Sequence, residues 1–211
     1  MDWVDEAQPG AQPDLRHKTG EGRLALRKAA SMHNLDAFLR TAETNLNDAV
    51  RHFDEVTNPV AQEFVELKLQ ACIFQYDVCA EMVGIIRNEP NGFAACVALK
   101  GLVLRLFEYD LAMNKHLIPR MLLLAKTRGV PVNHADVREH RRKWKTELLA
   151  LQRWSYVRNQ AAGHYGTDIQ TQVSLLRTLN LDAVMEVTKA FLSFNMGLLV
   201  MLRDAGLGNA A

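Results

Sequence analysis

One arginine and one histidine in the C-terminal half of the chain are residue types suited to phosphodiester chemistry. Arg158 is followed directly by Asn159, and His164 comes six residues after the arginine. Arginine makes planar, permanently charged contacts with phosphate oxygens, and histidine changes its protonation state near neutral pH. Such a histidine can act as a general acid or base, and Asn159 can orient it or donate to a phosphate oxygen. The three residues are therefore candidate catalytic groups for cleaving RNA without a metal, with the ribose 2′-hydroxyl as nucleophile.

Spacing alone does not single out this pair, because the chain contains the same spacing at 27–33 and 128–134. Only the third copy has an amide residue beside the arginine and lies within a basic segment. In an unbroken helix a separation of six residues turns about 600°, which leaves Arg158 and His164 about 120° apart. Gly163 is expected to end the helix and to let the histidine approach the arginine. The glycine is then part of the predicted site.

A dense set of basic residues precedes the motif and gives a local positive charge. Residues 138–158 hold seven lysines and arginines and two glutamates, whereas the whole chain has a net charge of only +1. A local basic surface of this kind can bind the RNA backbone. A solvated helix face has the same composition, so the interpretation depends on the Arg158 site. The candidate RNA-binding residues are Arg138, Arg141, Arg142, Lys145, Arg153 and Tyr165.

These residues resemble the motif of the HEPN superfamily, the higher eukaryotes and prokaryotes nucleotide-binding domains. Its members are small helical bundles in which an arginine and a polar residue, here Arg158 and Asn159, precede a histidine, here His164. The resemblance implies a metal-independent endoribonuclease that acts as a homodimer, with two motifs facing each other. It also implies a place in a defence or toxin–antitoxin system, with an antitoxin or regulatory protein as a partner. Members that accept a nucleotide have tyrosine two residues after the histidine, where this chain has Gly166.

The periodicity of apolar residues predicts the elements that must position this motif. Apolar side chains recur at three- and four-residue spacing, typical of amphipathic helices, and no strand-like alternation occurs. We expect an all-α, up-and-down, HEPN-like bundle of about five long helices in residues 23–206, preceded by a flexible arm over residues 1–22. The predicted helices are 34–56, capped by Asn34, then 59–88, 93–118 with a continuation at 120–126 beyond Pro119, 134–162 and 181–202, with one short helical turn near 173–176.

Three other groups of residues are candidates for metal or acid–base sites. A polar stripe on the helix 59–88 lacks the histidines of a di-iron site, and a solvated face explains it better. Glu108 and Asp110 are two positions apart and point to different sides of a helix. His134 and His140 flank Asp136 at a spacing that suits a metal poorly. We therefore predict no metal and no cofactor. The stripe consists of Glu63, Glu66, Gln70, Asp77 and Glu81.

The apolar runs of the sequence indicate where the protein is located and whether it associates. The acidic N-terminus lacks the apolar stretch of a signal peptide, and the run 190–202 is shorter than the roughly 20 residues of a membrane span. We expect a cytoplasmic protein with no membrane partner, with Trp144 and Trp154 in its core. The three cysteines lack metal-ligand spacing and suit a reducing compartment.

The helices 59–88 and 93–118 are so apolar that they favour association. A non-catalytic bundle that binds nucleotide, RNA or a protein partner is the alternative function.

Overall fold

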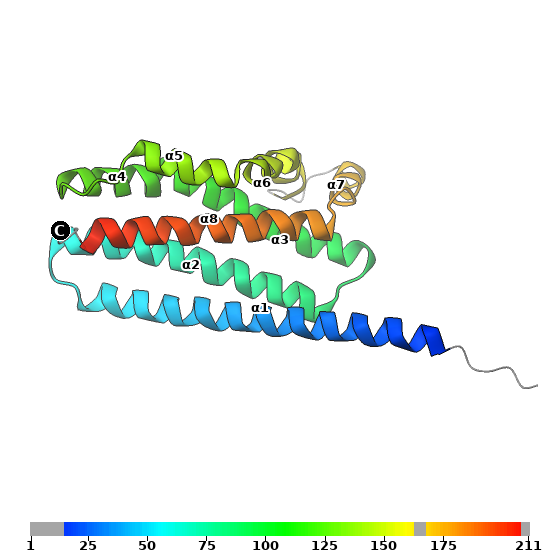
Figure 1. Cartoon of the computed structure of the whole chain (residues 1–211). Helices are drawn as coiled ribbons and strands as arrows, with labels where there is room; N and C mark the ends of the chain where they lie inside the picture. Colours follow the sequence, from blue (N-terminus) through cyan, green and yellow to red (C-terminus); the bar gives the residue numbers. More distant parts are fainter. Residues whose placement is uncertain (1–14, 163–167, 208–211) are drawn as a thin grey trace, which may run out of the picture.

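The computed structural model describes residues 15–162 and 168–207, and it describes side chains at 34–159 and 168–206. The described part is helical and contains no strand, which confirms the all-α prediction (Figure 1). The helices are α1 (Leu15–Glu55), α2 (Pro59–Asn88), α3 (Gly92–Ala112), α4 (Ile118–Thr127), α5 (His134–Lys143), α6 (Lys145–Ala150), α7 (Ile169–Leu176) and α8 (Leu181–Leu207). Three tighter or wider turns interrupt them: η1 (Met113–Leu117), η2 (Leu151–Trp154) and η3 (Val157–Ala162).

The centre of the bundle is formed mainly by α2, α3 and α8. Phe191 and Phe194 of α8 are completely buried, as are Leu102 and Leu106 of α3. Burial of each such side chain contributes about 1.5–3 kcal/mol. Helix α2 lies between α1 and α8 (Figure 1), which explains why its sequence is apolar nearly all round. The helices α5 and α6 pack against α8 on the side away from α1.

A polar network inside the core joins α2, α3 and α8. The Tyr109 hydroxyl donates to Asn195 Oδ1, and Asn195 Nδ2 donates to the Ala71 carbonyl at 3.2 Å. The Tyr109 ring stacks on Phe74, with ring centroids 3.5 Å apart. Burial raises the pKa of the Tyr109 phenol, so the group stays a neutral donor. These bonds fix the positions of the three helices because a buried polar group without a partner is costly.

The first helix is longer than predicted. Helix α1 begins at Leu15, so the prediction of Asn34 as its N-cap is wrong, and residues 15–22 of the expected arm are helical. Gly20 and Gly22 favoured an arm, but glycine inside a helix costs only about 1 kcal/mol relative to alanine. Residues 23–32 are rich in alanine, leucine, lysine and arginine, which are strong helix formers and compensate for this cost. The predicted start of α2 is confirmed, because Asn58 caps it and Pro59 opens it.

Pro119 does not end the helix that contains it. The chain from Gly92 to Thr127 is continuously helical, and the π-helical turn η1 comes just before the proline. Proline lacks an N–H and its ring clashes with a carbonyl of the preceding turn, and a wider turn relieves this clash. The predicted end of one helix at residue 88 is confirmed, and the connection after Thr127 contains Gly129, with a φ of +70°.

The predicted helix 134–162 is divided into four pieces. Its backbone leaves the α conformation at Trp144, where φ is −116° and ψ is 17°. Beyond that point four buried residues, Leu148, Leu151, Trp154 and Val157, are three positions apart. A 3₁₀ turn has three residues per turn, so the tight turn η2 keeps Leu151 and Trp154 on one face, toward the core. The single-helix prediction was wrong because this spacing drifts around an α-helix.

A close approach between α5 and α8 depends on Gly197. The His140 ring stacks on Phe194 with centroids 4.9 Å apart, and its Nε2 lies 2.9 Å from the Phe194 carbonyl. A Cβ atom at position 197 would overlap the His140 ring. His140 is thus committed to packing, and the described residues contain no cluster of three His, Cys, Asp or Glu suited to a metal.

Gly197→Ala is expected to lower the free energy of unfolding by about 1–3 kcal/mol, because the His140 ring must move out of its packed position. Urea unfolding measures this change. Gly84→Ala is the matched control, since no atom lies within 4 Å of a Cβ at that position of α2. The control is expected to raise stability by about 0.5–1 kcal/mol. Equal effects of the two substitutions would contradict the proposed steric role of Gly197.

Two helices are long and apolar enough to cross a membrane by length and composition alone, α2 and residues 181–206 of α8. Half of the apolar window in each is buried within the bundle, and core helices of soluble proteins meet the same criteria. Both helices are longer than the apolar run 190–202, on which the sequence-based argument against a membrane span depended. The cytoplasmic location stays a prediction.

Candidate functional site

Arg158 and Asn159 lie on the π-helical turn η3, which packs against α3. Val157, directly before them, is completely buried and anchors the turn in the core. The side chains of Arg158 and Asn159 are both exposed. Single π-helical turns insert an extra residue into a helix and occur often at functional sites. The structure therefore presents the first two motif residues to solvent from a rigid anchor.

The other motif residues, Gly163, His164 and Tyr165, lie outside the described residues. The described helical segment runs to Ala162, two positions before the histidine. The structure thus places Arg158 and Asn159 beside each other. The approach of His164 to Arg158 and the contribution of Tyr165 to RNA binding stay predictions.

Arg158 has two neighbours on α3 that sequence reasoning did not identify. Its guanidinium carbon lies 6.0 Å from the centroid of the Phe107 ring, within reach of a cation–π contact. Its Nε lies 3.9 Å from Glu108 Oε1, at the outer limit of an ion pair. An exposed pair of this kind contributes about 0–1 kcal/mol. The arginine is therefore oriented by α3 while its charge remains available to a phosphate.

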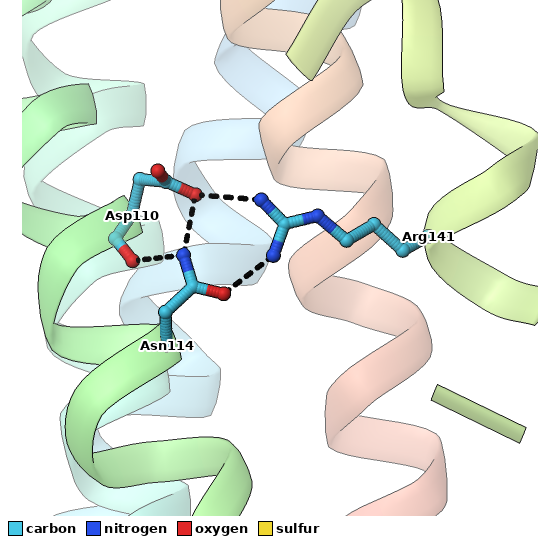
Figure 2. Close-up of polar contacts among 3 residues, drawn as sticks. All are labelled: Asp110, Asn114 and Arg141. Carbon is cyan, nitrogen blue, oxygen red and sulfur yellow. Dashed lines mark hydrogen bonds and ion pairs between the residues drawn. The ribbon is translucent and has the colours of Figure 1, made fainter. Parts of the chain in front are cut away.

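The neighbouring acid, Asp110, belongs to a different set of contacts (Figure 2). Arg141 Nη2 lies 3.3 Å from Asp110 Oδ1, and Arg141 Nη1 donates to Asn114 Oδ1. Asn114 Nδ2 donates to the Asp110 carbonyl at 2.7 Å and to its Oδ1 at 3.0 Å. These bonds join the junction of α3 and η1 to α5. Glu108 and Asp110 thus contact different arginines, in keeping with side chains that point to different sides of the helix.

The candidate RNA-binding residues differ in how far their charges are neutralised. Arg141 is half-buried in the bridge just described, and Arg142 pairs with Glu139 at 3.0 Å. Arg138, Lys145 and Arg153 are exposed, and the described residues offer none of them a carboxylate within ion-pair distance. Because the segment is broken at Trp144, these three cations are distributed over α5, α6 and η2. They are the strongest described candidates for contact with a polyanion.

In the copy of the arginine–histidine spacing at 128–134, the arginine already makes contacts within the bundle. Arg128 donates to the Gly206 carbonyl, and its guanidinium lies 5.3 Å from the centroid of the Phe64 ring. His134 is exposed at the first position of α5, after the loop. Arg128 therefore makes contacts within the bundle, whereas His134 lies beyond the loop and is exposed. For the copy at 27–33, the structure describes only the helical backbone.

The remaining candidates from the sequence are structural. Trp154 is buried, and Trp144 is half-buried against the core, as predicted. On the polar stripe of α2, Glu66 pairs with Arg120 at 2.8 Å, and Asp77 and Glu81 both accept from Arg105. The stripe is therefore partly paired with arginines of α3 and α4 instead of being only solvated. Cys72 and Cys79 are buried and Cys96 is half-buried, and all three are free.

Comparison of the chain with models of known protein families, with curated proteins and with solved structures gives no match. The function is accordingly inferred from the residues and contacts described above.

Proposed function

We propose that this protein is a metal-independent endoribonuclease of the HEPN type, active as a cytoplasmic homodimer. The observation that carries the proposal is the exposure of Arg158 and Asn159, side by side on a π-helical turn just before the segment that contains His164. The all-α fold agrees with that of the superfamily. The biological setting proposed is a defence or toxin–antitoxin system, in which an antitoxin or regulatory protein restrains the enzyme.

The proposed reaction needs charge stabilisation and two proton transfers. The RNA 2′-hydroxyl attacks the adjacent phosphorus, the bond to the 5′-oxygen of the next nucleotide breaks, and a 2′,3′-cyclic phosphate forms. The proton leaves the 2′-oxygen, and a proton is delivered to the departing 5′-oxygen. Arg158 holds the phosphate oxygens as their charge grows, and His164 transfers a proton. With two motifs in a dimer, one histidine can act as the base and the other as the acid.

Association is supported by apolar side chains that this single chain leaves exposed. Phe93 and Val97 of α3 and Val60 and Ile73 of α2 are exposed, on the two helices that the sequence marked as unusually apolar. Phe93 and Val97 are four positions apart and share one face of α3, which a second copy of the chain can cover. Light scattering after size-exclusion chromatography measures the molar mass directly. A monomer at all concentrations would contradict the dimer.

The decisive assay incubates the purified protein with mixed RNA in EDTA, beside a DNA of matched sequence. RNA cleavage is expected to persist in EDTA and to leave cyclic phosphate ends, and the DNA is expected to stay intact because it lacks the attacking hydroxyl. RNA binding without cleavage would instead support the alternative, a non-catalytic bundle. Cleavage of both nucleic acids, abolished by EDTA, would exclude the proposed mechanism.

A further inference from the structure

A hollow of about 470 Å³ is lined by residues of α1, α2 and α8. Its lining includes His52 of α1, Phe64 and Lys68 of α2, and Leu199 and Leu202 of α8. Small-molecule sites in proteins commonly have volumes of about 300–1,000 Å³. None of the motif residues or their described neighbours lines this hollow, so it is distinct from the candidate RNA site.

The walls of the hollow are mostly apolar. Phe64 and Leu202 are buried and provide a fixed base, and Leu199 is half-buried. Met196 and Val200 of α8 also line the hollow and remain 40% and 44% exposed. Covering such surface contributes roughly 25 cal/mol per Å². An apolar ligand body therefore gains by lying along α8.

One positive charge in the hollow lacks a counter-charge. Lys68 Nζ lies 3.1 Å from His52 Nδ1. An ammonium group can only donate, so His52 Nδ1 is the acceptor in this contact and supplies no negative charge. Among the residues that the structure describes, no carboxylate lies within ion-pair distance of Lys68. The lysine therefore keeps its full charge while facing an apolar surface.

The other charged residues of the hollow are already compensated. Asp48 pairs with Arg51 at 2.9 Å, and Arg203 pairs with Asp204 at 2.8 Å. The charge of Lys68 acts on the buried Cys72, which also lines the hollow. Burial raises the pKa of the Cys72 thiol, and Lys68 opposes this rise. Lys68 is thus the charge that a ligand would neutralise.

From this arrangement we infer that the hollow binds an amphipathic organic anion, an aliphatic carboxylate. The carboxylate accepts a hydrogen bond from Lys68 Nζ, and the chain lies against Phe64, Leu199 and Leu202. A charge-assisted hydrogen bond at a partly buried site favours an anion over a neutral alcohol of equal length. This site is independent of the proposed ribonuclease activity.

Octanoate and 1-octanol are matched probes, because they share a chain length and differ in charge. Isothermal titration of the full-length protein at pH 7 is expected to show octanoate binding about tenfold or more tightly than 1-octanol. Lys68→Met, which keeps the apolar stem, is expected to abolish this preference. Lys68→Arg is expected to retain it. Lys189→Met is the matched control, since Lys189 is an exposed lysine of α8 that does not line this hollow.

Thermal unfolding of each variant shows whether the fold is kept, and the Lys68→Arg variant provides a second readout if Lys68→Met is unstable. Loss of octanoate binding in Lys68→Met, with wild-type affinity in Lys189→Met, would support the site. Three results would overturn it: no octanoate binding to the wild-type protein, equal affinities for octanoate and 1-octanol, or unchanged octanoate affinity in Lys68→Met.

Discussion

Arg158→Ala and His164→Ala are each expected to reduce the rate of RNA cleavage by about 100-fold or more. Proton transfer by a positioned side chain contributes about 10²–10⁴-fold to a rate, which sets the scale for the histidine. For Arg158, the loss removes the charge that stabilises the phosphate in the transition state. The measurement is the initial rate of cleavage of a labelled RNA in EDTA. A temperature scan of each variant shows that the fold is intact, as expected for an exposed arginine.

The matched control is His134→Ala, in the decoy copy of the same spacing. His134 is exposed at the start of α5, and its cleavage rate is expected to equal that of the wild-type protein. Arg138→Ala, on the same helix, is expected to weaken RNA binding modestly, more at low salt, because it removes one phosphate contact. Cleavage that persists in both motif variants would exclude the catalytic assignment.

Asn195→Ala is expected to lower the free energy of unfolding by about 2–4 kcal/mol, because the buried Tyr109 hydroxyl loses its acceptor and a small cavity is left. Asn195 is completely buried, so water cannot replace the missing group without entering the core. Urea unfolding, with the slope checked for two-state behaviour, measures the change.

A double-mutant cycle tests whether the hydrogen bond is the cause. Tyr109→Phe removes the hydroxyl while keeping the ring stacked on Phe74. In the double variant the hydroxyl is absent, so the loss from Asn195→Ala is expected to be smaller than in the wild-type background. Losses that add to within about 0.3 kcal/mol would show that the two side chains act independently.

Much of the fold followed from local sequence signals. Asn58 and Pro59 marked the start of α2, and the residues 89–92 and 129–131 marked two connections, because caps and turns depend on nearby backbone geometry. The failures also had local causes. The apolar residues from Leu148 to Val157 recur every three positions, which suits the 3₁₀ turn η2 better than the predicted single α-helix.

The neighbours of the candidate site depended on contacts between distant segments. Glu108 is two positions from Asp110, yet its described partner is Arg158, 50 residues later in the chain. Asp110 in turn contacts Arg141 of another helix. Which of two acids meets which arginine depends on how α3, α5 and η3 pack, and helical periodicity does not contain that information.

The sequence by itself determined that the chain is helical, where α2, α5 and α8 begin, and that Arg158, Asn159 and His164 form the motif to test. Apolar periodicity and capping act over a few residues, so these features are readable without coordinates. Tertiary structure alone decided that Arg158 rests near Phe107, that Arg141 is held in a bridge, and that Lys68 faces an apolar hollow without a counter-charge. Burial and charge pairing depend on residues far apart in sequence, which meet only when the helices pack.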